Sequence, residues 1–148
     1  MVMDIKCAFL YGKTPRDIYI ELPDEDPMSI NKDYVGKLLK AMYGTRDAPA
    51  VWQEEIRALV TNMNFTQSRI NPCVYYNRER DLRVNVHVDD VLVTGMEEDL
   101  IWFRESLKKV WELKATILGG HDNPVGESVF LGRTIRLTEK GYRDRGGR

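Results

Sequence analysis

The stretch that decides the fold is RVNVHVDDVLVTG, residues 83–95, in which two aspartates interrupt a run of β-branched residues. Residues 83–88 alternate long polar and β-branched side chains, which predicts a strand, and a second strand resumes at once over 91–95. Two strands joined by so short a connection form a β-hairpin. The sequence therefore predicts a hairpin that carries Asp89 and Asp90 at its tip.

Apolar periodicity predicts a helix on each side of this hairpin. Over 48–63 the apolar residues recur at spacings of one, three and four, and Pro49 stands in the first turn, where proline is tolerated. Over 97–111 a second apolar face follows three acidic residues, which suit the positive end of a helix. Shorter apolar runs bounded by glycine, proline or polar clusters predict strands over 2–10, 18–22, 73–76, 113–118 and 129–137. Residues 34–43 fit either a strand or a short helix, and a strand over 35–39 is favoured because glycine and proline follow soon after.

This order of elements is typical of an α+β fold. We expect a small mixed or antiparallel sheet with two main helices packed on one face and the first strand beside the acidic hairpin. A chain of 148 residues with 43% hydrophobic content is long enough for one core and too short for two ordinary domains. We therefore expect a single unit over 1–137 and a polar, disordered tail over 138–148.

Charge and apolar runs narrow the classes of function. The net charge of −1 gives no general basic signature, so any nucleic-acid binding must rest on local patches or on missing parts of the molecule. No segment reaches the roughly 18 apolar residues that a membrane span needs. Because a strand is already under way at residue 1, we expect the chain to be a fragment of a longer protein.

The carboxylates in apolar strands are the candidate site. Asp89 and Asp90 are explained either as a solvated hairpin turn or as cation ligands, and Asp4 either as an edge-strand or salt-bridged residue or as a third ligand. Carboxylates that converge from adjacent strands suit hard divalent cations such as Mg²⁺. Phosphoryl transfer at such a site needs no side-chain nucleophile.

Five segments, in order along the chain, resemble the reverse transcriptases of copia-type (Pseudoviridae) retrotransposons. Residues 3–12, MDIKCAFLYG, are similar to the family's MDVKTAFLNG, and residues 87–90, HVDD, resemble its YVDD hairpin. Between them, LKAMYGTRDAPAVW at 39–52 resembles LKKALYGLKQAPRAW, and NPCVY at 71–75 resembles DPCLY. Phe130-Leu131-Gly132 resembles a later FLG. The resemblance implies a partial palm domain of the Pol polyprotein, with fingers, thumb and RNase H absent.

The resemblance also implies roles for individual residues. Asp4 and Asp89 would be the principal metal ligands, with Asp90 a third acidic group, and two Mg²⁺ ions, or Mn²⁺, would be the cofactors. Phe9 would exclude the 2'-hydroxyl of the incoming sugar, although a core phenylalanine is an equally good interpretation. Contacts to the templating base and incoming nucleotide would come from Tyr43, Gly44, Arg46, Ala48 and Pro49, although an arginine such as Arg46 often only precedes a helix.

Further expectations concern partners and departures from the family. The partners implied are an RNA or DNA template-primer, deoxynucleoside triphosphates and the rest of the Pol polyprotein, with no membrane, in a cytoplasmic virus-like particle that delivers DNA to the nucleus. Three departures from the family pattern bear on the site: His87 replaces Tyr, Thr45 replaces Leu and Asp47 replaces Gln. Asp47 would repel a triphosphate unless Arg46 or a metal ion compensates. Two rival interpretations remain: an inactive retroelement remnant and a ferredoxin-like nucleic-acid-binding module.

Overall fold

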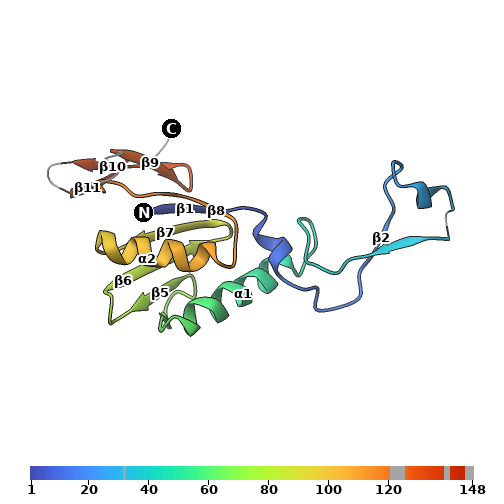
Figure 1. Ribbon diagram of the computed structural model, residues 1–148, viewed down its shortest axis with the longest axis horizontal. Helices are drawn as coiled ribbons and strands as arrows, with labels where there is room; N and C mark the ends of the chain where they lie inside the picture. The colour runs from blue at the N-terminus through green and yellow to red at the C-terminus, as the bar shows by residue number, and fades with distance from the viewer. Residues whose placement is uncertain (32, 121–125, 139–140, 146–148) are drawn as a thin grey trace. The chain divides into compact units, whose positions relative to one another are not determined.

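The computed structural model describes residues 1–31, 33–120, 126–138 and 141–145 (Figure 1). It divides into two compact units, the first made of Met1–Lys6 with Arg57–Arg148 and the second of Cys7–Ile56. The prediction of a single domain over 1–137 stays a prediction, because compact units within one chain need not fold separately. The division falls inside helix α1 (Ala48–Asn62), where no linker composition marks it.

The first unit is built on a six-stranded antiparallel sheet in the order β4-β5-β6-β7-β1-β8. Strand β6 (Leu82–His87) and strand β7 (Asp90–Thr94) pair as the predicted hairpin, and β1 (Val2–Ile5) pairs with β7. The remaining strands are β4 (Thr66–Gln67), β5 (Val74–Asn77) and β8 (Leu113–Thr116). The expectation that the first strand lies beside the hairpin is confirmed.

Alternation along the strands separates a buried face of this sheet from an open one. On β6, Leu82, Val84 and Val86 are buried, whereas Arg83 and His87 are exposed. Helix α2 (Glu97–Lys108) runs along the sheet and buries Leu100, Phe103 and Leu107, with the Phe103 ring 5.3 Å from that of Phe65 (Figure 1). The acidic first turn of α2 and its apolar stripe agree with the sequence prediction. The chain is thus a mixed α and β fold with two α-helices and an antiparallel sheet, as expected.

A second sheet of the first unit joins β9 (Glu127–Phe130), β10 (Arg133–Thr138) and β11 (Gly141–Arg145) in the order β11-β10-β9. One strand over 129–137 was expected, but Leu131 and Gly132 both have positive φ, 51° and 72°, and turn the chain between β9 and β10. Within the predicted tail, residues 141–145 form β11 and pair with β10. That the tail as a whole is disordered stays a prediction. The other tail residues, except for 138, lie outside the described residues.

The second unit contains little regular structure apart from the start of α1. Strands β2 (Tyr19–Glu21) and β3 (Val35–Lys37) pair antiparallel, as the strand predictions over 18–22 and 35–39 required. Two short 3₁₀ helices, η1 (Ala8–Tyr11) and η2 (Pro27–Ile30), complete it. Among the helices of the described residues, none combines the length and apolar character needed to cross a membrane.

Candidate active site

Asp4 lies on β1, next to the edge strand of the six-stranded sheet, with β7 on one side and the edge strand β8 on the other. It is directly opposite Asp90 on β7. Met1 exchanges both backbone hydrogen bonds with Val93, each 2.8 Å, and the Ile5 N–H donates to the Asp89 carbonyl at 2.9 Å. Odd-numbered residues of β1 therefore form the hydrogen-bonded pairs with β7. Asp4 and Asp90 form a non-hydrogen-bonded pair, the type in which opposed side chains lie closer together.

The tip of the hairpin is a two-residue turn made of Val88 and Asp89. Val88 has a φ of 56°, a left-handed conformation that glycine adopts readily and a β-branched residue rarely does. Holding such a residue there costs on the order of 1–3 kcal/mol, which the surrounding β6 and β7 pairing must offset. The turn positions the Asp89 carbonyl so that it accepts a hydrogen bond from the N–H of Ile5, which lies on the same strand as Asp4.

The electrostatics of this cluster disfavour three free negative charges. Asp4 is exposed between buried neighbours, and Asp90 is half-buried. Burial raises the pKa of the Asp90 carboxyl above its usual value, and the charges of Asp89 and then Asp4 raise it further, whereas His87 acts in the opposite direction. A bound cation or a proton would relieve this repulsion.

The carboxylates fit a magnesium ion that keeps much of its water. Among the residues the structure describes, no three histidine, cysteine, aspartate or glutamate side chains are gathered closely enough to hold a metal ion. What the sheet offers is one opposed pair, Asp4 and Asp90, with Asp89 adjoining it. Mg²⁺ is commonly held by one or two carboxylates together with waters and substrate phosphates, so this donor set suits it. That these residues bind metal stays a prediction.

In the second unit, Phe9 and Tyr43 lie together. Cys7 has a φ of 51° and turns the chain out of β1 into η1, so the predicted strand over 2–10 ends at Ile5. The Phe9 ring is buried in this unit, with its centroid 4.5 Å from that of Tyr43, whose side chain is exposed. Two residues that the resemblance assigns to nucleotide binding are therefore in contact.

The residues that follow Tyr43 form a turn leading into α1. Gly44 has a φ of 92°, which favours glycine, and the Thr45 hydroxyl donates to the Met42 carbonyl at 2.8 Å. Ala48 is buried at the start of α1, and Pro49 occupies its first turn as predicted. Arg46 is exposed and, within the described part of the chain, forms no ion pair.

Comparison with known proteins identifies the family. Residues 1–143 match the family model described as reverse transcriptase (RNA-dependent DNA polymerase). The chain belongs to this reverse transcriptase family. The resemblance to copia-type elements is confirmed by its relatives.

These relatives are polyproteins of plant and yeast transposons. The chain is 29% identical over 97% of its length to the retrovirus-related Pol polyprotein from transposon TNT 1-94 of Nicotiana tabacum, of which it covers 11%. It is 35% identical over 67% of its length to the Pol polyprotein from transposon RE1 of Arabidopsis thaliana, covering 7% of it. It is 28% identical over 95% of its length to the transposon Ty1-NL2 Gag-Pol polyprotein of Saccharomyces cerevisiae, covering 8%. This reverse transcriptase chain thus spans about a tenth of such relatives.

Sequence reasoning missed two charged residues. In the second unit, the Arg16 Nε donates to the Asp47 Oδ2 at 2.6 Å, so Asp47 is paired with a cation other than the expected Arg46 or metal ion. Lys114 on β8 is directly opposite Asp4. Arg16 lies 31 positions from Asp47, so no local pattern marks the pair. Lys114 could have been found only by fixing the register of β8.

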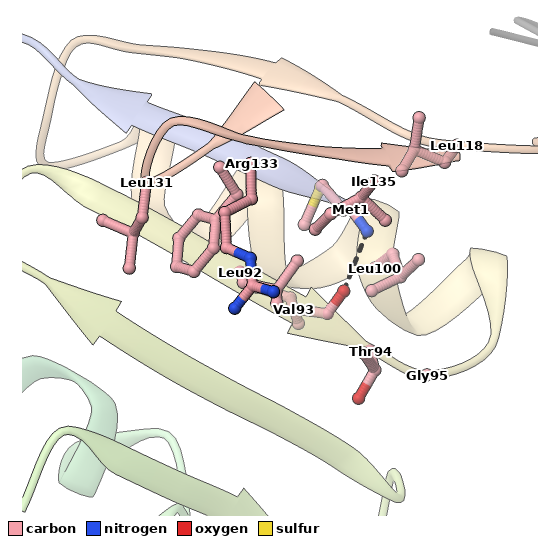
Figure 2. A pocket seen from close by; sticks show the side chains of 11 residues that line it. Met1, Leu92, Val93, Thr94, Gly95, Leu100, Leu118, Leu131, Arg133 and Ile135 are labelled. Carbon is pink, nitrogen blue, oxygen red and sulfur yellow. Dashed lines mark hydrogen bonds between the residues drawn. The ribbon is translucent and has the colours of Figure 1, made fainter. Parts of the chain in front are cut away.

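A cavity of about 460 Å³ in this reverse transcriptase chain is lined by residues other than the three carboxylates. It opens between β7, the start of α2 and the β9-β10 hairpin, and its lining is mainly apolar (Figure 2). Figure 2 shows the Arg133 side chain extending into it and the Met1 nitrogen bonded to the Val93 carbonyl. Asp4, Asp89 and Asp90 are absent from its lining, so this cavity is separate from the candidate carboxylate site.

Proposed function

We propose that this chain is part of the palm of an RNA-directed DNA polymerase of a copia-type retrotransposon and carries its catalytic carboxylates. The proposal rests on one observation: Asp4 on β1 is directly opposite Asp90 on β7 in a close cross-strand pair. The carbonyl of the neighbouring Asp89 accepts a hydrogen bond from the N–H of Ile5, which follows Asp4 on β1. Membership in the reverse transcriptase family supports it. An apolar strand has no structural reason to place like charges opposite each other, since such pairs destabilise a sheet.

The proposed reaction is transfer of a deoxynucleotide from its triphosphate to the 3'-hydroxyl of a primer. Asp4 and Asp89 are the principal ligands in this proposal, and Asp90 is a third acidic group beside them. Two bound Mg²⁺ ions, or Mn²⁺, would supply activation of the attacking hydroxyl and stabilisation of the leaving pyrophosphate. The chain's own task is to hold its carboxylates on paired strands, where little reorganisation is needed.

Nucleotide recognition is proposed for residues of the second unit. Phe9 is assigned the exclusion of the 2'-hydroxyl, and Tyr43, Gly44, Ala48 and Pro49 the contacts to base and sugar. The exposed Arg46 guanidinium is suited to phosphate, because it presents several N–H donors in a fixed geometry. The packing of Phe9 against Tyr43 supports a shared role, since each ring limits where the other can move.

The proposed partners follow from the relatives, which are Pol and Gag-Pol polyproteins. They are an RNA or DNA template-primer, deoxynucleoside triphosphates and the other segments of the polyprotein, including fingers, thumb and RNase H. A cytoplasmic particle is the proposed setting. The chain's net charge of −1 supports a need for basic surfaces from other segments to hold a polyanionic duplex.

One observation favours a second candidate, a nucleic-acid-binding module without chemistry. Tyr76 is 36% exposed on the open face of the sheet, and the Arg83 guanidinium lies 5.1 Å from the centre of its ring. Exposed aromatic rings on a sheet stack on bases in such modules. The Tyr76 hydroxyl donates to Asp81, and Asp81 also pairs with Arg83, so this ring is already fixed by its own neighbours.

Titration of the purified chain with Mn²⁺, followed by calorimetry, tests the proposal. We expect Asp4→Asn and Asp89→Asn each to weaken binding at least about tenfold, because a ligand to a hard cation is lost. Glu98→Gln, which removes an exposed carboxylate from α2, is the matched control and should change binding less than twofold. A chain that binds no Mn²⁺, or binds it equally in all four proteins, would refute the proposal and favour the inactive remnant.

The same proteins separate the second candidate. A binding module should retain a single-stranded oligonucleotide without metal, lose it in Tyr76→Ala and keep it in Asp89→Asn. A polymerase palm should show the reverse pattern, with binding that depends on Asp89 and Mn²⁺.

A further inference from the structure

His87 is placed beside Asp90 by the register of the β6-β7 hairpin. The two residues are directly opposite each other, one on each side of the two-residue turn. Opposed residues of an antiparallel pair project from the same face of the sheet, with Cβ atoms roughly 4.5–5.5 Å apart. Asp4 is opposite Asp90 on its other side. The open face therefore carries a row of His87, Asp90 and Asp4, in which an imidazole adjoins the two carboxylates.

The His87 side chain is exposed and is not engaged by other protein groups. Among the residues that the structure describes, its imidazole takes part in no hydrogen bond or ion pair. Burial raises the pKa of the Asp90 carboxyl and His87 lowers it, so the two groups lie within electrostatic reach of each other. An imidazole held by register beside carboxylates is available to a ligand that the carboxylates bind.

The spacing across the hairpin suits two donor atoms on one metal ion. Nitrogen and carboxylate oxygen ligands lie about 2.0–2.2 Å from a small divalent ion. Two side chains whose Cβ atoms are roughly 5 Å apart therefore meet at a single ion between their tips. Such a pair leaves the remaining coordination positions to water, to a further carboxylate and to substrate oxygens.

Divalent ions differ in how well they accept a nitrogen ligand. Mg²⁺ is a hard ion that takes oxygen ligands. The affinity of transition-metal ions for sites that contain nitrogen rises from Mn²⁺ through Co²⁺, and Mn²⁺ also suits carboxylates and water. An imidazole among carboxylates therefore favours Mn²⁺ over Mg²⁺, whereas a tyrosine at the same position offers no nitrogen.

We propose that His87 is a nitrogen ligand to Mn²⁺ at the carboxylate site and makes the site select Mn²⁺ over Mg²⁺; this inference rests on the proposed function. The residue is a feature of this chain, because the copia-type pattern has tyrosine where His87 stands. His87 and Asp90 hold the ion from the two strands of the hairpin, so the selection is built into the pair that closes its turn.

Electron spin echo envelope modulation of bound Mn²⁺ tests the inference directly, because it detects nitrogen nuclei coordinated to the ion. The chain is used without an affinity tag and contains two histidines, His87 and His121. We expect ¹⁴N modulation in the wild type and in the control His121→Gln, and its loss in His87→Gln and His87→Tyr. Labelling with ¹⁵N-histidine should replace the ¹⁴N signal by a ¹⁵N signal, which identifies the ligand as an imidazole.

Calorimetric titration supplies a second readout. Loss of the imidazole in His87→Tyr should weaken Mn²⁺ binding by about tenfold and Co²⁺ binding by more, while Mg²⁺ binding changes less than twofold. His121→Gln should match the wild type for each ion. An equal fall for Mg²⁺ and Mn²⁺ would overturn the inference, because the loss would then come from a general change in charge or packing.

Failure of this inference is distinguishable from failure of the proposed function. If Mn²⁺ binding depends on Asp89 but the wild type shows no ¹⁴N modulation, or the modulation persists in His87→Gln, the His87 assignment is overturned and the carboxylate site stands. If Mn²⁺ does not bind, the proposed function fails and this inference fails with it. Circular dichroism melts confirm that each variant is folded, and the wild-type spectrum decides the question without any variant.

Discussion

Replacing Asp90 with asparagine should stabilise the folded chain at neutral pH. Asp90 and Asp4 form a close cross-strand pair of like charges, and Asp90 is also next to Asp89. Cross-strand pairs contribute roughly 0.2–1 kcal/mol, and direct opposition of like charges is unfavourable by a similar amount. The partial burial of Asp90 puts the expected gain near the upper end, about 1 kcal/mol. For a chain of this size, that corresponds to a rise in Tm of roughly 2–4 °C.

The gain should depend on pH in a defined direction. Because the pKa of Asp90 is raised in the folded state, its ionised form is disfavoured there relative to the unfolded chain. The wild type therefore loses stability as the pH rises from the ordinary carboxyl value of 3.8 through the raised folded value, and it has lost the full amount above both. The Asp90→Asn variant lacks this loss. The difference in Tm between the two proteins should be full at pH 7, should shrink as the pH falls through the raised folded value, and should vanish below the ordinary value of 3.8.

Thermal melts followed by circular dichroism between pH 3.5 and 7.5 measure this difference. Asp24→Asn, at an exposed position in the loop before η2, is the matched control and should leave Tm unchanged at every pH. Adding Mg²⁺ at neutral pH should narrow the gap, since a bound cation stabilises the wild type more than the variant. A variant that melts at or below the wild-type temperature at pH 7, or a gap that does not change with pH, would refute the repulsion argument.

Two further predictions concern the hairpin tip and the sugar. Val88→Gly should raise the urea midpoint and the free energy of unfolding by roughly 0.5–1 kcal/mol, because glycine adopts a φ of 56° without steric cost and the side chain is 39% exposed. A lower midpoint would show that the Val88 side chain contributes more by packing than its backbone conformation costs. In a polymerase containing the remaining segments, Phe9→Val should raise kcat/KM for UTP relative to dTTP by about tenfold or more, because the ring proposed to exclude the 2'-hydroxyl is replaced by a smaller side chain. An active enzyme with unchanged selectivity would make Phe9 a packing residue of its unit.

Elements with strong local periodicity were predictable from the sequence. The α1 and α2 helices and the β6-β7 hairpin repeat their apolar pattern over enough residues to fix their type and nearly their ends. The errors lie where a single backbone angle redirects the chain. Cys7 and Leu131 both adopt a positive φ although neither is glycine, so composition gives no sign that β1 ends at Ile5 or that β9 and β10 are separate.

The site was predictable in its residue types and incompletely in its geometry. The sequence places carboxylates on two strands, but the pairing that sets Asp4 opposite Asp90, with Asp89 in the turn, depends on register. Register is decided by long-range backbone hydrogen bonds such as that between Ile5 and Asp89, and these leave no local trace. Lys114 was missed for the same reason, because it belongs to no motif and only the register of β8 places it opposite Asp4.

The departures from the family pattern bear on whether the chain is a remnant. Asp47 introduces a negative charge into the segment assigned to the nucleotide, yet its carboxylate is paired with Arg16 at 2.6 Å and is 29% exposed. His87 replaces a tyrosine and is directly opposite Asp90. It lowers the pKa of the Asp90 carboxyl, which burial and the charges of Asp89 and Asp4 raise. A surface ion pair contributes only about 0–1 kcal/mol, so stability alone gives little reason to compensate these charges. Their effect is on the local field, where an unpaired Asp47 would repel a triphosphate. Because Arg16 pairs with Asp47, the added charge is no argument against the anion contact proposed for this segment.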